Sequence, residues 1–181
     1  QKSKLVAISS GNQGVALAYC ANLLHLGAPV IYVPTTTPSP KLEKMRHFGA
    51  KVVLLGNLYD ETHVLAERII EEEGSIYVDS REDEIGAAGQ GSIAAEVREQ
   101  LPEVENIIVP MGSGGTAIAV ASYFKQRDPS VKVYAVEASN CPSLVEFLKA
   151  NRWQKTFDVL TDGEPLLKSL VGGCAKLAFD H

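Results

Sequence analysis

The sequence predicts an α/β fold with mostly parallel sheets, arranged as three α/β/α layers in two lobes. Short apolar runs alternate with longer stretches of helical pattern along most of the 181 residues. Alternation with short connections is typical of βαβ units, in which consecutive strands pair in parallel. Several of the apolar runs have no polar position, as expected for strands that helices cover on both faces.

The first expected elements are a strand over 5–9 (LVAIS) and a helix over 12–26 that is rich in Ala and Leu. Gly27 follows this helix, and glycine is common just beyond a helix C-terminus. The next run, 29–34 (PVIYVP), is apolar and β-branched. It therefore predicts a buried strand.

The following segment repeats this pattern. A helix over 41–48 is expected to stop at Gly49, and the β-branched run 51–56 (KVVLLG) predicts the next strand. The stretch 60–73 has apolar and acidic residues on opposite sides of a helix. On its apolar side we expect Val64, Leu65 and Ile69, with His63 at the surface.

A strand over 75–79 and a charged loop over 80–86 (SREDEIG) come next, and the loop is a candidate boundary between two βαβ-rich blocks. Beyond it the alternation continues to about residue 150. The expected elements there are a helix over 87–101, a strand over 106–112, a helix over 114–125, a strand over 132–138 and a helix over 142–150.

Composition argues against several classes of function. The net charge is −5 and the 17 basic residues are scattered, so we expect no nucleic-acid partner. No apolar run approaches the roughly 20 residues of a membrane span, and no signal-peptide pattern is visible. Three widely separated cysteines predict neither a disulfide framework nor a zinc site, so we expect a cytoplasmic protein.

Two polar, glycine-rich junctions stand between a strand and a helix, where ligands bind in open α/β sheets. The second junction, GSGGT (112–116), has the chemistry of a phosphate cradle. Glycines let the backbone approach an anion closely, and the free N–H groups of a helix N-terminus point at it. Ser113 and Thr116 can add hydroxyl groups.

The first junction, SSGNQG (9–14), lacks the Gly-Lys-Ser/Thr ending of a Walker loop. It places four polar side chains at a helix N-terminus, a position that suits a carboxylate or another small anion. Helix capping alone would require one such residue. These four are Ser9, Ser10, Asn12 and Gln13.

A dinucleotide site is the main alternative. Gly112, Gly114 and Ala117 spell G-x-G-x-x-A after a strand, and Glu137 ends the next strand, where a Rossmann protein carries its ribose-binding acid. However, the fingerprint normally follows the first strand of the domain, and this interpretation leaves the SSGNQG junction unexplained.

Taken together, the motifs resemble one family, the fold-type-II pyridoxal-phosphate enzymes related to the tryptophan synthase β chain. Serine/threonine dehydratases and serine racemase are the most similar members, and cysteine synthase is more distant. The resemblance covers about residues 4–140 and is carried in order by AISSGNQGVALAYCANLLHLGAPVIYVP, PSPKLEKMRHFGAKVVLLG, AAGQGSIAAEV and IIVPMGSGGTAIAVASYFKQRDPSVKVYAVEAS.

The resemblance implies a role for each junction. Asn12 would hydrogen-bond the 3′-oxygen of the pyridoxal ring, and Ser10 matches the serine that donates or accepts a proton in serine racemases. Gln90 and Gly91 match a segment that lines the site. The implied substrate loop is Ser9, Ser10, Gly11, Asn12 and Gln13, and the implied phosphate cradle is Gly112, Ser113, Gly114, Gly115 and Thr116.

The family also implies an activity and an architecture. Its dehydratases eliminate water from serine or threonine, giving a 2-oxo acid and ammonia, with pyridoxal 5′-phosphate as the electron sink. Residues 10–83 would form the smaller, mobile lobe with the substrate loop. Residues 1–9 and 84–181 would form an incomplete cofactor-holding lobe, and homodimers are common in the family.

Two expected features have no match in the chain. The family's Schiff-base lysine lies well before the SSGN motif, whereas Lys2 and Lys4 only open the strand that leads to it. We therefore expect a fragment that lacks this lysine, so whether the chain alone is an enzyme stays open. Glu137 matches one carboxylate of a metal site in some relatives, but residues 139–143 offer no second one, and we expect no metal.

Three functions therefore remain under consideration. The chain is part of a pyridoxal-phosphate-dependent lyase of the serine/threonine dehydratase type, with a small amino acid as its substrate. Alternatively, it is a catalytically inactive remnant that binds pyridoxal phosphate or an amino acid. The least favoured interpretation is a dinucleotide-binding domain of the Rossmann type.

Overall fold

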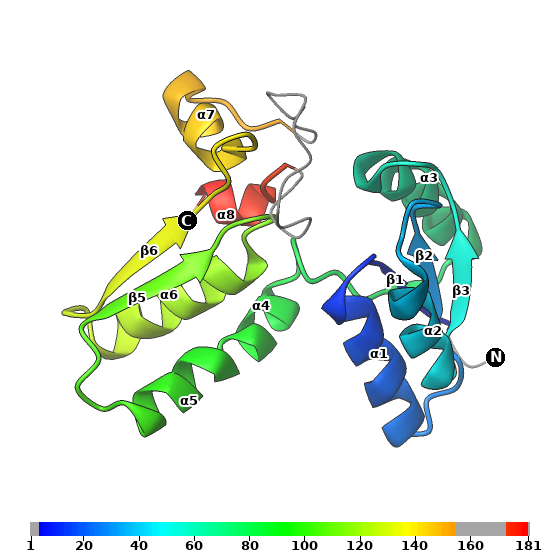
Figure 1. Ribbon diagram of the computed structural model, residues 1–181, viewed down its shortest axis with the longest axis horizontal. Coiled ribbons are helices and arrows are strands. Elements are labelled where there is room, and N and C mark those ends of the chain that lie inside the picture. The colour runs from blue at the N-terminus through cyan, green and yellow to red at the C-terminus, as the bar shows by residue number, and fades with distance from the viewer. Residues whose placement is uncertain (1–3, 155–172, 181) are drawn as a thin grey trace. The chain divides into compact units, whose positions relative to one another are not determined.

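The computed structural model describes residues 4–154 and 173–180 (Figure 1). The chain divides into two compact units, Gln1–Asp79 and Ser80–His181. Each unit has hydrophobic core residues of its own. Within the described residues, no helix combines the length and the apolar character that crossing a membrane requires.

The first unit contains a four-stranded parallel sheet with the strand order β3-β2-β1-β4. Its strands are β1 (Leu5–Ile8), β2 (Val30–Val33), β3 (Lys51–Leu54) and β4 (Ile76–Tyr77). A helix follows each of the first three strands, as the alternating pattern predicts. These helices are α1 (Asn12–Leu23), α2 (Ser39–His47) and α3 (Tyr59–Glu73).

Both faces of this sheet are covered, which makes three layers and explains the continuous apolar strands. Successive side chains of a strand point to opposite faces. Accordingly, Tyr32 packs with Ala66 of α3, whereas its neighbours Ile31 and Val33 pack with Met45 of α2. The predicted α/β class and layer order are confirmed for this unit.

The second unit pairs β5 (Asn106–Pro110) with β6 (Lys132–Val136) in parallel (Figure 1). Its core includes Val109, Val120, Phe124 and Phe147. The helices of this unit are α4 (Glu84–Gln90), α5 (Ser92–Gln100), α6 (Gly115–Arg127), α7 (Ser143–Ala150) and α8 (Lys176–Asp180).

The prediction of one helix over 87–101 was wrong in two respects. The helical segment begins earlier, because Asp83 caps α4 by accepting a hydrogen bond from the Ile85 amide at 3.0 Å. It is also two helices, separated at Gly91. There the hydrogen bonds tighten to a three-residue spacing, since the Ala94 amide donates to the Gly91 carbonyl at 3.0 Å.

The end of α1 also differs from the prediction. The helix stops at Leu23, and His25, with φ of 54°, adopts the left-handed conformation just beyond the C-cap, two residues before Gly27, whose φ is also positive at 93°. The Leu26 amide then donates to the Ala21 carbonyl at 2.9 Å, as in a Schellman motif.

The buried side of α3 is rotated relative to the predicted one. Thr62, Ala66 and Ile70 are buried, whereas Val64 and Leu65 are only half-buried. His63 is buried too, because its ring lies between the Tyr77 hydroxyl and the Glu67 carboxylate, each 3.3 Å from a ring nitrogen. The expectation of a surface histidine was therefore wrong.

The division between units falls after Asp79. The lobes expected from the resemblance were 10–83, and 1–9 with 84–181. In the structure, β1 lies inside the four-stranded sheet, because it pairs with β2 on one edge and β4 on the other. Residues 5–8 therefore belong structurally to the first unit.

Candidate functional site

The SSGNQG loop, residues 9–14, follows the carboxyl end of β1 at a point where the sheet's connections diverge. From β1 the chain passes through α1 to β2 on one side, whereas β3 connects through α3 to β4 on the other side of β1. Ligands of open α/β sheets bind at such switch points, outside the carboxyl ends of the strands. The topology therefore places this loop where a ligand site is expected.

Ser9 has a structural role in this loop. Its side chain is only 8% exposed, and its Oγ accepts hydrogen bonds from the Gly11 amide at 3.3 Å and the Gly14 amide at 3.1 Å. These bonds satisfy amides at the start of α1 that have no acceptor within the helix. Ser9 is thus the side chain that caps α1.

The Gln13 side chain joins the loop 9–14 to the segment that follows β4 through a hydrogen bond. Its Nε2 donates to the Val78 carbonyl, just beyond β4, at 2.9 Å. Its Oε1 is buried and has no hydrogen-bond partner within the described part of the chain. The nitrogen that was expected to hold a substrate carboxylate therefore already has a backbone partner.

Three residues of the loop remain accessible. Ser10 and Gly11 are half-buried and Asn12 is exposed. The first turn of α1 contains no acidic residue, and the amides of Asn12 and Gln13 lie in the part of a helix that lacks intrahelical acceptors. This end of α1 can therefore receive a small anion such as a carboxylate.

The second loop, residues 112–116, follows the carboxyl end of β5 and leads into α6. Gly114 has φ of 98°, a conformation that L side chains rarely adopt. A Cβ atom at Gly114 would also lie 2.4 Å from the Ala178 Cβ and 2.9 Å from the Met111 Cε. Backbone conformation and crowding together require glycine at this position.

Gly115 is required for a different reason. A Cβ atom there would lie 2.4 Å from the Ser80 carbonyl oxygen and 2.9 Å from the Gln90 Nε2. The backbone of the loop therefore packs directly against the segment that begins the second unit. The Ser113 carbonyl is fixed as well, since it accepts a hydrogen bond from the Ala175 amide at 2.8 Å.

The residues of this loop fit a phosphate group. The first intrahelical bond of α6 runs from the Ile118 amide to the Gly114 carbonyl, at 2.9 Å. The amides of residues 114–117 therefore have no acceptor within the helix. No acidic residue lies in the first turn, and Gly112, Ser113 and Thr116 are only half-buried, whereas Gly114 and Gly115 are buried. These are the donors and the access that an anion at a helix N-terminus requires.

The Glu137 carboxylate is hydrogen-bonded to the N-terminus of α7. It accepts hydrogen bonds from the Leu144 amide at 2.8 Å, the Val145 amide at 3.1 Å and the Ser143 hydroxyl at 3.3 Å. It thus caps α7, a favourable place for a negative charge. This geometry argues against Glu137 as a ribose-binding acid, and so against the dinucleotide alternative.

Cys174 is fully buried and lies close to this capped helix end. Its amide donates to the Ser143 Oγ at 3.1 Å, and its carbonyl accepts from the Trp153 indole nitrogen at 2.9 Å. Burial, together with the Glu137 charge, raises the pKa of the Cys174 thiol to about 11. Cys174 is therefore protonated at neutral pH and poorly suited to act as a nucleophile.

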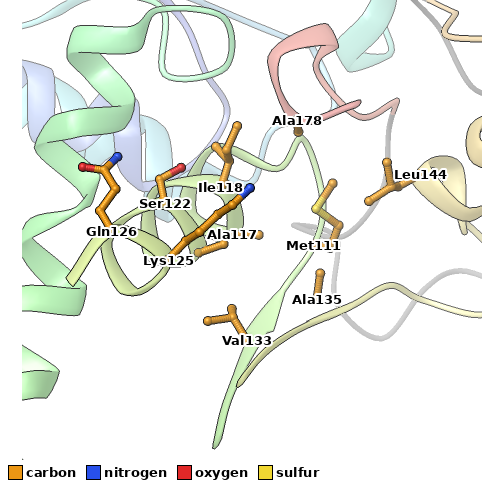
Figure 2. A pocket seen from close by; sticks show the side chains of 11 residues that line it. Met111, Ala117, Ile118, Ser122, Lys125, Gln126, Val133, Ala135, Leu144 and Ala178 are labelled. Carbon is orange, nitrogen blue, oxygen red and sulfur yellow. The ribbon is translucent and has the colours of Figure 1, made fainter. Parts of the chain in front are cut away.

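A pocket of about 530 Å³ lies between α6 and the β5–β6 sheet (Figure 2). It is mostly apolar, with Met111, Val133 and Leu144 in its wall and Lys125 as its charged lining residue. None of the predicted site residues lines it. The residues predicted to form the site thus lie in the two loops and not in the wall of this pocket.

The contacts that hold the loops in place were only partly visible in the sequence. Gln90, which belongs to the AGQG segment, donates to the Ser80 carbonyl at 3.1 Å and accepts from the Thr116 hydroxyl at 2.7 Å. The Ser80 and Val78 carbonyls were missed. They act through the main chain, which any residue type provides, so no sequence signal marks them.

Comparison with known proteins identifies relatives along nearly the whole chain. Residues 1–174 match the family model described as pyridoxal-phosphate dependent enzyme. An L-threonine ammonia-lyase of Thermotoga maritima is 36% identical over 167 residues, which are 92% of this chain and 40% of that protein. A catabolic L-threonine dehydratase of Staphylococcus aureus is 32% identical over 166 residues, 90% of this chain and 48% of that protein.

Solved structures also match this chain along nearly its whole length. The processed form of threonine deaminase isoform 2 from Solanum lycopersicum matches with a TM-score of 0.86 and 28% identity, over 98% of this chain and 48% of that one. Maize serine racemase matches with a TM-score of 0.84 and 25% identity, over 97% of this chain and 52% of that one. The chain spans about half, or less, of these relatives.

Proposed function

Because the chain belongs to the pyridoxal-phosphate-dependent enzyme family, we propose that it is the part of a threonine or serine dehydratase-type lyase that holds the cofactor phosphate and the substrate carboxylate. The observation that carries this proposal is the loop 112–116. Its crowded glycines and the unsatisfied amides at the start of α6 fit the phosphate of the family's cofactor.

Each unit contains one of the two loops. In the second unit, the amides of residues 114–117 bind the phosphate, and Ser113 is the remaining hydroxyl donor. In the first unit, the amides of Asn12 and Gln13 bind the substrate carboxylate, and the exposed Asn12 side chain is available for the pyridine 3′-oxygen. When bound, pyridoxal phosphate supplies an electron sink for the Cα of the amino acid.

Ser10 is the residue of this chain best placed to move a proton. Its side chain is half-buried at the start of the loop, and its hydroxyl has no hydrogen-bond partner within residues 4–154 and 173–180. It can therefore both donate and accept. We assign it the exchange of a proton with the substrate, as its match to the racemase serine implies.

Lys4 is unsuited to hold the cofactor covalently. Its Nζ lies 2.6 Å from the Glu73 carboxylate, and this hydrogen bond raises the pKa of Lys4 above its ordinary value. It also precedes β1, whereas the loop follows the strand. This arrangement agrees with two interpretations. The chain is a fragment that relies on a Schiff-base lysine elsewhere, or it is a remnant that binds pyridoxal phosphate without catalysing a reaction.

The substrate that we propose is threonine or serine, since the relatives are named for threonine. We infer cytoplasmic residence from the scattered cysteines, as the sequence predicts. A homodimer stays a prediction from the family resemblance. The dinucleotide function is not proposed, because Glu137 caps α7.

A titration of this chain with pyridoxal phosphate tests the proposal. Visible absorbance would follow binding, and borohydride reduction with mass spectrometry would locate any lysine adduct. We expect saturable binding, no binding of NAD and no adduct on Lys4. A folded chain that does not bind pyridoxal phosphate would contradict the proposed function. An adduct on one lysine would contradict only the missing-lysine part.

A further inference from the structure

Gln90, the last residue of α4, joins two segments that are distant in sequence. Its Nε2 donates to the Ser80 carbonyl at 3.1 Å, and its Oε1 accepts from the Thr116 hydroxyl at 2.7 Å. A Cβ atom at Gly115 would lie within 3 Å of both the Ser80 oxygen and this amide nitrogen. The start of α6 is therefore in close contact with Ser80 through one side-chain amide.

The orientation of this amide follows from its partners. A main-chain carbonyl oxygen can only accept, so the Nε2 of Gln90 must face Ser80 and its Oε1 must face Thr116. A hydroxyl group has one proton. The proton of Thr116 is therefore used in the bond to Gln90, and the Thr116 oxygen offers only lone pairs to other groups.

We infer that Gln90 is a positioning residue for the phosphate loop. It holds Gly115 and Thr116 against Ser80 and accepts the hydrogen bond of the Thr116 hydroxyl. A bound phosphate therefore receives its hydrogen bonds from the main-chain amides and not from Thr116. Thr116 and Gln90 then act as a unit. This inference rests on the proposed function for its ligand, and it replaces the expectation that Thr116 is a direct donor to the phosphate.

The two hydrogen bonds of Gln90, to Ser80 and Thr116, should protect the amides of residues 112–117 from hydrogen exchange. This protection can be measured without any ligand. Gln90→Met preserves length and removes both bonds. We expect amide hydrogen exchange in residues 112–117 to become at least about tenfold faster, since the loss of the Thr116 hydrogen bond alone accounts for roughly that factor. Gln100→Met is the matched control, because Gln100 is also the last residue of its helix and is exposed.

Binding of pyridoxal phosphate tests whether the two residues act together. We expect Gln90→Met and Thr116→Val each to weaken binding about five- to tenfold. The double variant should be no weaker than Gln90→Met, because the contact that Thr116→Val removes is already lost in Gln90→Met. Thr116→Ser keeps the hydroxyl and should retain the affinity of the unsubstituted chain. Circular dichroism at the titration temperature checks that every variant is folded.

The outcomes separate this inference from the proposed function. If Thr116→Val weakens binding as much in the Gln90→Met background as in the original chain, Thr116 contacts the phosphate itself and the inference is wrong. Unchanged exchange of residues 112–117 in Gln90→Met would also overturn it. If the original chain binds no pyridoxal phosphate, the proposed function fails, whereas the exchange experiment still decides whether Gln90 positions the loop.

Discussion

At the scale of single residues, two neighbouring glycines are required in the loop 112–116 for different physical reasons. Gly114 needs a left-handed backbone, whereas Gly115 lies against the Ser80 carbonyl with no room for a methyl group. Both glycines are buried by these neighbours, so glycine is required here for close packing as well as for the backbone turn. A loop that only needed to turn would require the first constraint and not the second.

Replacing Gly115 by alanine should therefore be costly. The added methyl group would lie 2.4 Å from a main-chain oxygen, which cannot move as a flexible side chain can. We expect a loss of about 1–3 kcal/mol in the free energy of unfolding, the usual range for overpacking. Urea denaturation would measure it.

Gly89→Ala is the matched control for this substitution. Gly89 lies in α4, where an added Cβ would meet nothing within 4 Å. Because alanine restricts the unfolded chain more than glycine does, we expect a gain of about 0.4–1 kcal/mol. Equal effects of the two substitutions would contradict the steric account of Gly115.

The cysteines should differ sharply in reactivity. Cys20 is exposed, whereas Cys141 and Cys174 are buried. At neutral pH we expect one fast-reacting thiol in the native chain and three in denaturant, measured with a disulfide reagent such as DTNB. A second fast thiol in the native chain would contradict the described burial.

The pH dependence of this labelling follows from the raised pKa of Cys174. An ordinary thiol ionises near pH 8.5, whereas burial raises the pKa of Cys174 to about 11. Raising the pH from 7 to 9 should therefore leave the Cys174 thiol almost fully protonated and slow to react. Because the folded pKa is the higher one, the stabilisation from this thiol is complete below about pH 8.5 and is lost as the pH rises through 11.

At the scale of elements, both candidate loops depend on helix N-termini, and one of these is capped by Ser9. Ser9→Ala removes the acceptor of the Gly11 and Gly14 amides. We expect a loss of about 1 kcal/mol in the free energy of unfolding. Ser10→Ala, whose hydroxyl has no partner within the described residues, should change stability by less than about 0.5 kcal/mol.

A similar prediction concerns Glu137, whose carboxylate caps the N-terminus of α7. The substitution Glu137→Gln keeps the size of the side chain, removes the negative charge from the helix N-terminus and turns an NH₂ group toward one of the capped amides. We expect the free energy of unfolding to fall by about 1–2 kcal/mol, measured by thermal or urea unfolding. An unchanged stability would reopen the interpretation of Glu137 as a ligand-binding acid.

The order and type of most elements could be predicted because strands and helices have different apolar periods. Their ends could not. Gly91 divides α4 from α5 without a proline or a charged break, and His25 takes a backbone conformation that Gly27 was expected to provide. His63 was missed because its burial depends on Tyr77, which is distant in sequence and contacts it only in the folded unit.

At the scale of the whole molecule, the two units differ in how well their sheets are enclosed. Within residues 4–154 and 173–180, β1 has a paired strand on each edge, whereas β5 and β6 form a two-stranded sheet in which Ile108 is 73% exposed. Two-stranded sheets are marginally stable without further packing. We expect the amides of β1 and β2 to exchange more slowly than those of β5 and β6. Equal protection would contradict this difference.

The sequence also predicted where the two polar, glycine-rich loops lie in the fold, but not which of their atoms are available. The SSGNQG and GSGGT loops lie at the carboxyl ends of β1 and β5 as expected. Within them, Ser9 and Gln13 are engaged in hydrogen bonds, and Thr116 donates to Gln90. These hydrogen bonds depend on partner groups elsewhere in the fold, so the apolar period and the motif spacing of the sequence do not reveal them.

The most direct test of the account is a comparison of pyridoxal phosphate with pyridoxal, followed by the backbone amide NMR signals of the ¹⁵N-labelled chain. If the loop 112–116 binds the phosphate, pyridoxal phosphate should shift the amides of residues 114–117, and pyridoxal should leave them unchanged. Equal shifts with both compounds, or no shift at these amides, would contradict the assignment of this loop as the phosphate site.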